Sequence, residues 1–244
     1  MACRPGTITV AFRPRPGARY RYHVVVRTDS TLIVAGQPTR HTSTTVTVDA
    51  DQVVESSSGD GTRVQVALHF ATGESRQVVI RLDRASQLVG LDAQPGSSLG
   101  ELGVAEVFPT AAGSPPDHPL RPGERWSVSK VLELPDSVPT RLTGHGRLSH
   151  VGVLAGRRSA TVATTLDLPV VRRTEDGGRE SVLEGVQHTE LTTTHAVADG
   201  AVEHAVATTT ADYALRLLPP VGVDGPVAHG SLQLSVRSVT TRTA

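Results

Sequence analysis

The sequence has little or none of several residues that define other protein classes. Cys3 is the only cysteine among 244 residues, which excludes an intrachain disulfide, a Cys-x-x-Cys redox pair and a multi-cysteine zinc site. Lys130 is the only lysine and asparagine is absent, so arginine supplies nearly all of the positive charge. Aromatic residues make up only 3% of the chain. No apolar run reaches the roughly 20 residues that a membrane-spanning helix needs, so we expect no transmembrane segment.

Positive and negative charges are balanced in number. The chain carries 24 basic and 24 acidic residues, and both signs are scattered along it. Such a distribution argues against a field strong enough to hold the phosphates of a nucleic acid or an anionic membrane surface. We therefore expect no nucleic-acid partner, and composition does not indicate an oligomeric state.

Valine and threonine are abundant and together form about a quarter of the residues. Both are branched at Cβ, which suits a pleated, half-buried strand better than a helix. In residues 64–70, Val64, Val66, Leu68 and Phe70 alternate with polar or small residues, as in a strand with one buried face. The composition predicts an all-β protein.

A short pattern occurs twice. Arg15-Pro16-Gly17-Ala18-Arg19-Tyr20 is repeated as Arg121-Pro122-Gly123-Glu124-Arg125-Trp126, and each copy precedes an alternating strand. We predict a first β-meander in residues 1–93, a linker or lid in 94–120 with a short helix at 99–108, and a second β-meander in 121–244. These duplicated antiparallel meanders are expected to form a curled sheet, half-barrel or barrel within one structural domain.

Turn residues give finer predictions. Thr7 to Phe12 is typical of a short strand, and Gly59-Asp60-Gly61 of a hairpin turn. A turn centred on Asp176-Gly177 would place Arg173 opposite Glu180, and one centred on Asp199-Gly200 would place His195 opposite His204.

Lys130 is the most informative single residue of the second opening strand. It shares a strand face with Trp126, Val128 and Leu132, and an ammonium there must be paired, reach an edge or lose its charge. One interpretation is an anchor for a ligand's carboxylate or phosphate, or a base. The other is a lysine whose aliphatic stem lies along the apolar face while its ammonium reaches solvent.

Three aromatic residues lie at equivalent starts of the two halves. Tyr20, Tyr22 and Trp126 would line one end of a shared interior if the halves are brought together, either capping the core or forming the mouth of a pocket. We include Lys130, Tyr20, Tyr22 and Trp126 as candidate ligand-binding residues, and we expect no catalytic residue, metal or cofactor.

Three further motifs are weaker, and a purely structural role explains each of them at least as well as a functional one. Two opposed histidines, His195 and His204, would need a converging third ligand, and Glu190 and Glu203 project to the other face, so a metal site is not expected. Gly96-Ser97-Ser98-Leu99-Gly100 matches Gly-x-Ser-x-Gly, but it lies in a linker of small residues. Gly144 and Gly146 leave a bare patch on one strand face, which favours equally a ligand contact or a bend.

The stretch from Thr7 to Val26, followed a hundred residues later by Pro119-Leu120-Arg121-Pro122-Gly123-Glu124-Arg125-Trp126, resembles an uncharacterised family of bacterial β-rich envelope proteins that are often predicted to be lipoproteins. A looser likeness is to half-barrels of the lipoprotein-carrier type, which implies lipid binding beneath a helical lid. The resemblance supplies no catalytic residues. It implies the cell envelope if Cys3 is a lipid-modified mature N-terminus; otherwise the chain is expected in the cytoplasm.

The combined prediction is non-catalytic binding or carriage of an apolar or amphiphilic, lipid-like ligand in a curved β-sheet cavity. Two alternatives stay open. One is a β-barrel enzyme of the cyclase or isomerase type that acts on a hydrophobic metabolite. The other is a structural or protein-interaction module of the cell envelope.

Overall fold

The computed structural model describes residues 6–58, 61–83, 88–93, 115–132, 140–176, 179–219 and 225–243. These residues contain no helix and form a single sheet of 11 strands. The expected helix at 99–108, Ser98 and Cys3 lie outside them. The strands are β1 (Arg19–Val34), β2 (Arg40–Ser58), β3 (Gly61–Phe70), β4 (Ser75–Leu82), β5 (Leu88–Ala93), β6 (Arg125–Leu132), β7 (Thr140–Leu154), β8 (Arg157–Asp176), β9 (Arg179–Ala196), β10 (Val202–Leu217) and β11 (Ala228–Thr243).

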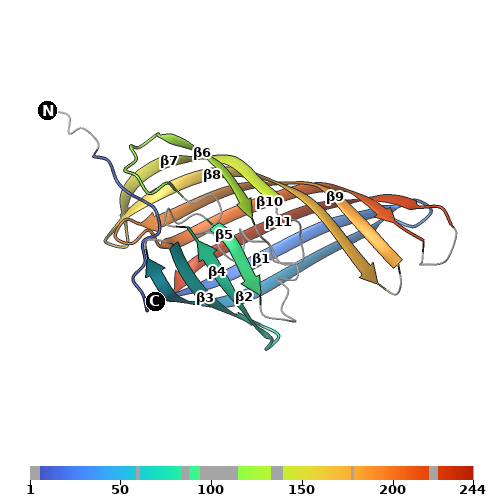
Figure 1. The fold of residues 1–244 in the computed structure, drawn as a ribbon, viewed down its shortest axis with the longest axis horizontal. Coiled ribbons are helices and arrows are strands. Elements are labelled where there is room, and N and C mark those ends of the chain that lie inside the picture. The colour runs from blue at the N-terminus through green and yellow to red at the C-terminus, as the bar shows by residue number, and fades with distance from the viewer. Residues whose placement is uncertain are drawn as a thin grey trace.

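The sheet consists of two antiparallel meanders joined through the first and last strands. Its strand order is β5-β4-β3-β2-β1-β11-β10-β9-β8-β7-β6. β1 is the first strand in the sequence and β11 is the last. They pair with each other from Arg21↔Thr243 to Val34↔Gly230. The sheet curls until its edge strands β5 and β6 meet, and the result is a nearly closed barrel (Figure 1). The predicted all-β class and barrel shape are confirmed.

The repeated sequence pattern forms two equivalent turns. Gly17 has φ of 78° and Gly123 has φ of 89°, a left-handed conformation that suits glycine. The Gly17 N–H donates to the Val54 carbonyl at 2.8 Å, and the Gly123 N–H donates to the Leu148 carbonyl at 2.6 Å. Each turn therefore begins a strand and fastens it to the next strand along the chain.

Strand alternation places the core inside the barrel. On β1, Tyr20, Tyr22, Val24 and Val26 are 2–4% exposed, while Arg19 and Arg21 point outward. The adjacent β2, β3 and β4 contribute an aliphatic wall. Its buried members include Val48, Val54, Val64, Val66, Leu68, Val78 and Ile80.

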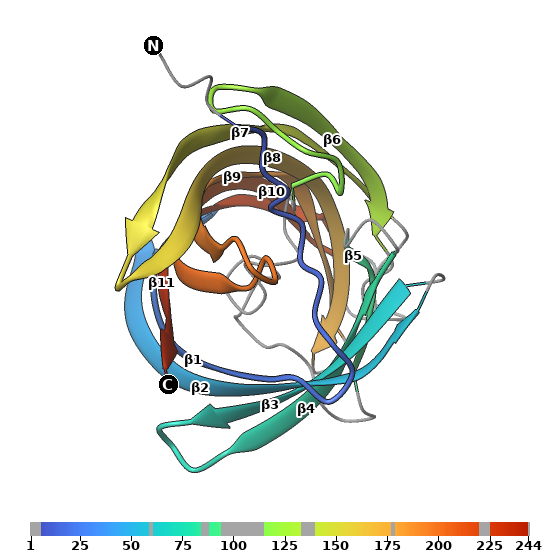
Figure 2. The ribbon, with the colours of Figure 1, turned by 90° about the vertical axis from the view of Figure 1, so that its left-hand side faces the viewer.

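Residues 6–13 cross one end of the barrel, which we call the N-terminal end (Figure 2). The strand predicted for Thr7–Phe12 is wrong, because these residues make only one isolated bridge, Ile8↔Leu120. The segment is held by packing: the Phe12 ring meets the Tyr20 ring edge-on at 5.5 Å, and the Arg13 N–H donates to the Asp199 carbonyl at 2.7 Å. The N-terminal end of the interior is thus covered by the chain itself.

The turn residues predicted the position of one hairpin correctly and the strand register of two others incorrectly. Ser58 pairs with Gly61, so β2 and β3 form a hairpin where Gly59-Asp60-Gly61 predicted one. In the β8–β9 hairpin Arg173 pairs with Val182 rather than with Glu180, a shift of two residues. The Arg173 and Glu180 side chains still form an ion pair at 3.4 Å, because a diagonal neighbour is within reach of a long side chain.

Candidate functional site

The interior changes character along the barrel. Near the N-terminal end its inward-facing residues are almost fully buried. Toward the opposite end, which we call the far end, leucines that face inward are only half-buried. These are Leu32, Leu168, Leu183, Leu232 and Leu234. Apolar side chains on the inner face that keep contact with solvent indicate an interior that is incompletely filled at the far end.

The two walls of the interior differ in chemistry. Opposite the aliphatic wall of β2–β4, strands β8–β11 present small and hydroxyl side chains to the inside. The buried hydroxyls are Thr164, Thr189, Thr193, Thr209, Ser238 and Thr240. Thr189 and Thr209 satisfy each other, with their Oγ1 atoms 2.8 Å apart. Such an interior offers apolar surface on one side and hydrogen-bonding groups on the other.

Tyr213 supplies a polar group among the half-buried leucines. It pairs with Leu232 on β11 and with Gly185 on β9, where a Cβ would lie 2.9 Å from the Tyr213 ring. Gln187 donates its amide N–H to the Tyr213 hydroxyl oxygen at 2.7 Å, which leaves the hydroxyl hydrogen free to act as a donor. Burial raises the pKa of Tyr213, while the Gln187 hydrogen bond and the Arg172 charge oppose the rise. Tyr213 is therefore a neutral donor.

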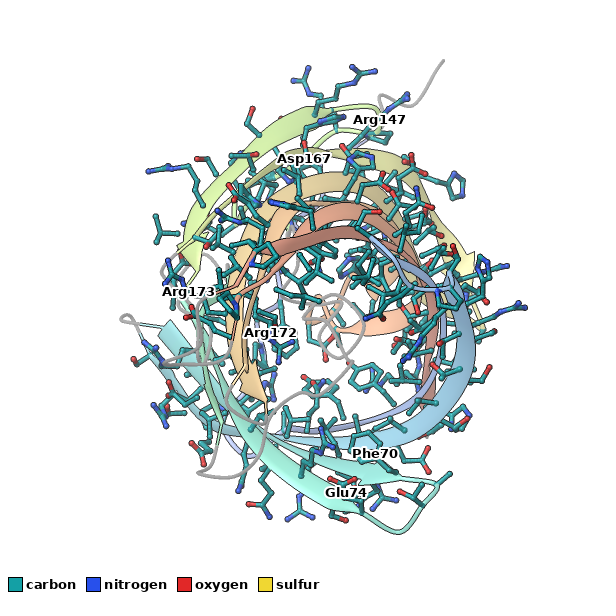
Figure 3. All side chains as sticks on the ribbon, turned by 90° about the vertical axis from the view of Figure 1, so that its right-hand side faces the viewer. Phe70, Glu74, Arg147, Asp167, Arg172 and Arg173 are labelled. Atoms are coloured by element: carbon teal, nitrogen blue, oxygen red, sulfur yellow. The ribbon has the colours of Figure 1, made fainter. Side chains whose placement is uncertain are left out.

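Arg172 brings a positive charge to the same part of the interior. By strand alternation it follows Leu168 and Val170 on the inner face of β8, and its register partner is Leu183. Figure 3 shows Arg172 on the interior side of the strand and Arg173 on the outer side. Arg173 pairs with Glu180, whereas Arg172 has no ion-pair partner among the described residues. The far end thus combines half-buried leucines with a guanidinium that no carboxylate of the described residues neutralises.

A groove of about 500 Å³ runs over β2, β1, β11 and β10 in the far half of the barrel. Most of its lining residues point outward by strand alternation, among them Asp29, His41 and Asp212. Asp29 is engaged by Arg27 at 3.1 Å, and the His41 Nδ1 lies 3.0 Å from the Thr31 hydroxyl. Within the groove, Thr31 pairs with His41 and Asp29 pairs with Ser43.

The structure places Lys130 at the junction of the two sheet edges. Its Nζ donates to Asp83 Oδ2 at 2.8 Å, and it thereby ties β6 to the residue that follows β4. Asp83 makes further contacts of its own. The ammonium is thus paired across the junction, and a ligand-binding role for Lys130 stays a prediction.

The three aromatic candidates occupy the N-terminal half of the interior. The Tyr20 hydroxyl donates to Asp199 at 3.1 Å, and the Arg242 guanidinium lies 5.0 Å from the centre of its ring. Tyr22 is 3% exposed, and burial, the largest effect, raises its pKa. Trp126 lies over Gly146, so the bare glycine patch is occupied by a side chain of this chain. A ligand-binding role for these residues also stays a prediction.

The two histidines do not meet. His195 pairs with Val202, and His204 pairs with Thr194, because the turn is longer than Asp199-Gly200 alone and a bulge follows it. His195 is buried between the Thr193 hydroxyl at 2.7 Å and the Gly200 carbonyl at 3.0 Å. Desolvation lowers its pKa to about 4. The predicted opposition of His195 and His204 is wrong, and no cluster of three metal-binding side chains occurs among the described residues.

Sequence reasoning missed Arg172 and Tyr213. Alternation of Leu168, Val170 and Arg172 against Asp167, Val171 and Arg173 was the available signal for Arg172. Pro169 interrupts that pattern, and the opposite charges of Arg173 and Glu180 mark only the outer face of the strand. No local pattern marks Tyr213, because its neighbours come from strands that precede and follow it.

Comparisons with known proteins give no family. No family model, no curated relative and no solved structure matches the chain. No helix that could span a bilayer occurs in the part of the chain that the structure describes.

Proposed function

We propose that this protein binds a small amphiphilic molecule, with an apolar tail and an anionic head, inside the barrel. The tail lies against the half-buried leucines of the far end, and the head contacts Arg172. The observation that carries the proposal is the incomplete burial of inward-facing leucines beside an inward-facing arginine that has no ion-pair partner among the described residues. Binding there removes leucine surface from water, at roughly 25 cal/mol for each Å² buried.

The polar groups fit a carboxylate or phosphate head. Arginine binds either group through two parallel N–H donors, which makes it a stronger anchor than a neutral donor. The free hydroxyl hydrogen of Tyr213 adds a second donor to the same region. Because the N-terminal end is crossed by residues 6–13, the ligand enters and leaves at the far end.

Two neighbouring arginines make a matched test. Arg172→Gln removes the interior charge, whereas Arg173→Gln removes an exterior charge one residue away on the same strand. We expect a fluorescent polyene fatty acid to bind the parent protein saturably and to bind Arg172→Gln at least ten-fold more weakly, since a charge-assisted hydrogen bond contributes about 1.5–3 kcal/mol. Arg173→Gln should bind like the parent.

A second pair tests the apolar lining. Leu234→Asn changes an inward-facing residue and Ser235→Asn changes its outward-facing neighbour, so only the first should weaken uptake of the probe. The corresponding fatty alcohol should lose little affinity in Arg172→Gln, because it has no charge to lose. Absence of saturable binding to the parent, or equal losses in Arg172→Gln and Arg173→Gln, would contradict the proposal and favour a structural module.

A further inference from the structure

Two exposed apolar residues lie at the tip of the β7–β8 hairpin. Val153 is 73% exposed and Leu154 is 48% exposed, and we call this pair the apolar tip. They precede a two-residue turn, Ala155-Gly156, in which both residues have positive φ, 47° and 78°. The hairpin belongs to the N-terminal end of the barrel (Figure 2).

Arginines without acidic partners gather at the same end. Arg125 and Arg147 are direct register partners on β6 and β7, both are exposed, and neither has an ion pair among the described residues. Like charges placed directly opposite each other normally destabilise a sheet. Another opposed pair, Arg63 and Arg81 in the first meander, is by contrast neutralised by carboxylates.

Further exposed arginines extend this cluster around the rim, and we call the whole set the arginine collar. Its members are Arg13, Arg15, Arg19, Arg121, Arg125, Arg147 and Arg158. Two acids at this end are engaged: Glu203 accepts from Arg242 at 2.8 Å, and Glu124 accepts from the Arg121 N–H at 2.8 Å. The chain has no net charge, yet its fold gathers at one end several arginines that have no ion pair among the described residues.

We infer that the N-terminal end is a docking face for an anionic lipid bilayer. A basic residue near such a surface contributes about 1 kcal/mol, and apolar side chains that enter the interface add to this attraction. Nucleic acid would engage the collar but gives no reason for an exposed Val153-Leu154 pair. The orientation leaves the far end pointing away from the membrane. This inference does not depend on ligand binding in the interior.

Vesicle flotation tests the docking face. The full chain should float with vesicles containing phosphatidylglycerol and stay behind with pure phosphatidylcholine, and rising salt should release it. Val153→Ser combined with Leu154→Ser, and separately Arg125→Gln combined with Arg147→Gln, should each lower bound protein at least five-fold. The matched controls are Val171→Ser, an exposed valine of the far half, and Arg237→Gln on the barrel wall; both should bind like the parent.

Fluorescence of the single tryptophan, Trp126, checks that each variant is folded. Failure of the folded parent to bind anionic vesicles would overturn the inference. Unchanged vesicle binding by the variant that combines Val153→Ser with Leu154→Ser would also overturn it. Tight, salt-sensitive binding to a DNA duplex that depends on the arginine collar but not on Val153 and Leu154 would also overturn it, and would assign the face to nucleic acid.

Discussion

Lys130 and Asp83 join the two edges of the sheet. Their 2.8 Å ion pair spans the junction at which the curled sheet nearly closes, and the two side chains are 36% and 26% exposed. Partial exposure limits such a pair to roughly 0.5–1 kcal/mol. The lysine that sequence analysis offered as a ligand anchor thus has a role in holding the barrel together.

Removal of this ion pair should affect stability more than ligand binding. We expect Lys130→Met to lower the free energy of unfolding by about 0.5–1 kcal/mol and to leave fatty-acid affinity within two-fold of the parent. Urea denaturation of Lys130→Met, Asp83→Asn and the double variant measures the coupling between the two residues. If Lys130→Met loses as much fatty-acid affinity as is expected for Arg172→Gln, Lys130 contacts the ligand and this prediction is wrong.

The contact between Trp126 and Gly146 gives a second prediction. A methyl group at residue 146 would overlap the indole ring, so Gly146→Ala should destabilise the fold by about 1–3 kcal/mol through overpacking. Gly152→Ala on the same strand is the control, because its Cβ would meet only the exposed His150 ring at 2.7 Å, which can move. Equal stability of the two variants, measured by urea denaturation, would show that the indole is not confined over Gly146.

His195 predicts a dependence of stability on acid. Its pKa is about 4 in the fold and about 6.5 when unfolded, so between these values the unfolded chain binds more protons. The free energy of unfolding should therefore fall as pH is lowered from about 6.5 to about 4, by up to about 3 kcal/mol from this residue. Denaturation across this range should give a flatter profile for His195→Gln. An unchanged slope in that variant would mean that other groups cause the acid sensitivity.

Ala155 provides a prediction of increased stability. It is the only non-glycine residue with positive φ among those described, and alanine is strained there whereas asparagine is favoured at this position of a type I′ turn. Ala155→Asn should raise the free energy of unfolding by about 0.5–1 kcal/mol. Ala214→Asn, at an exposed position within β10, should give no gain. A loss of stability in Ala155→Asn would show that the turn is not strained.

Local patterns predicted the strands well because a half-buried strand needs only alternation. The alternation of Val64, Val66, Leu68 and Phe70 with polar or small residues identifies the inward-facing side of that strand. The Gly17 and Gly123 turns are recognisable in the sequence because they repeat. The register between β9 and β10 was mispredicted because the turn that joins them is longer than Asp199-Gly200. The Asp199 side chain accepts the Ala201 N–H, and its carbonyl holds the N-terminal segment.

Long-range assembly was beyond local patterns. Pairing of β1 with β11 brings together residues about two hundred positions apart, and no periodicity encodes that choice. The same closure decides that Lys130 meets Asp83 while Arg172 remains unpaired among the described residues. It also gathers the arginine collar from segments whose charges look scattered in the sequence.

Native mass spectrometry of the full chain, purified without detergent and mixed with a long-chain fatty acid, tests the central claim most directly. The account predicts a one-to-one complex that is formed by the parent and by Arg173→Gln and is largely lost in Arg172→Gln. A spectrum that shows only the unliganded mass of the folded parent, up to the solubility limit of the fatty acid, would contradict binding in the barrel interior.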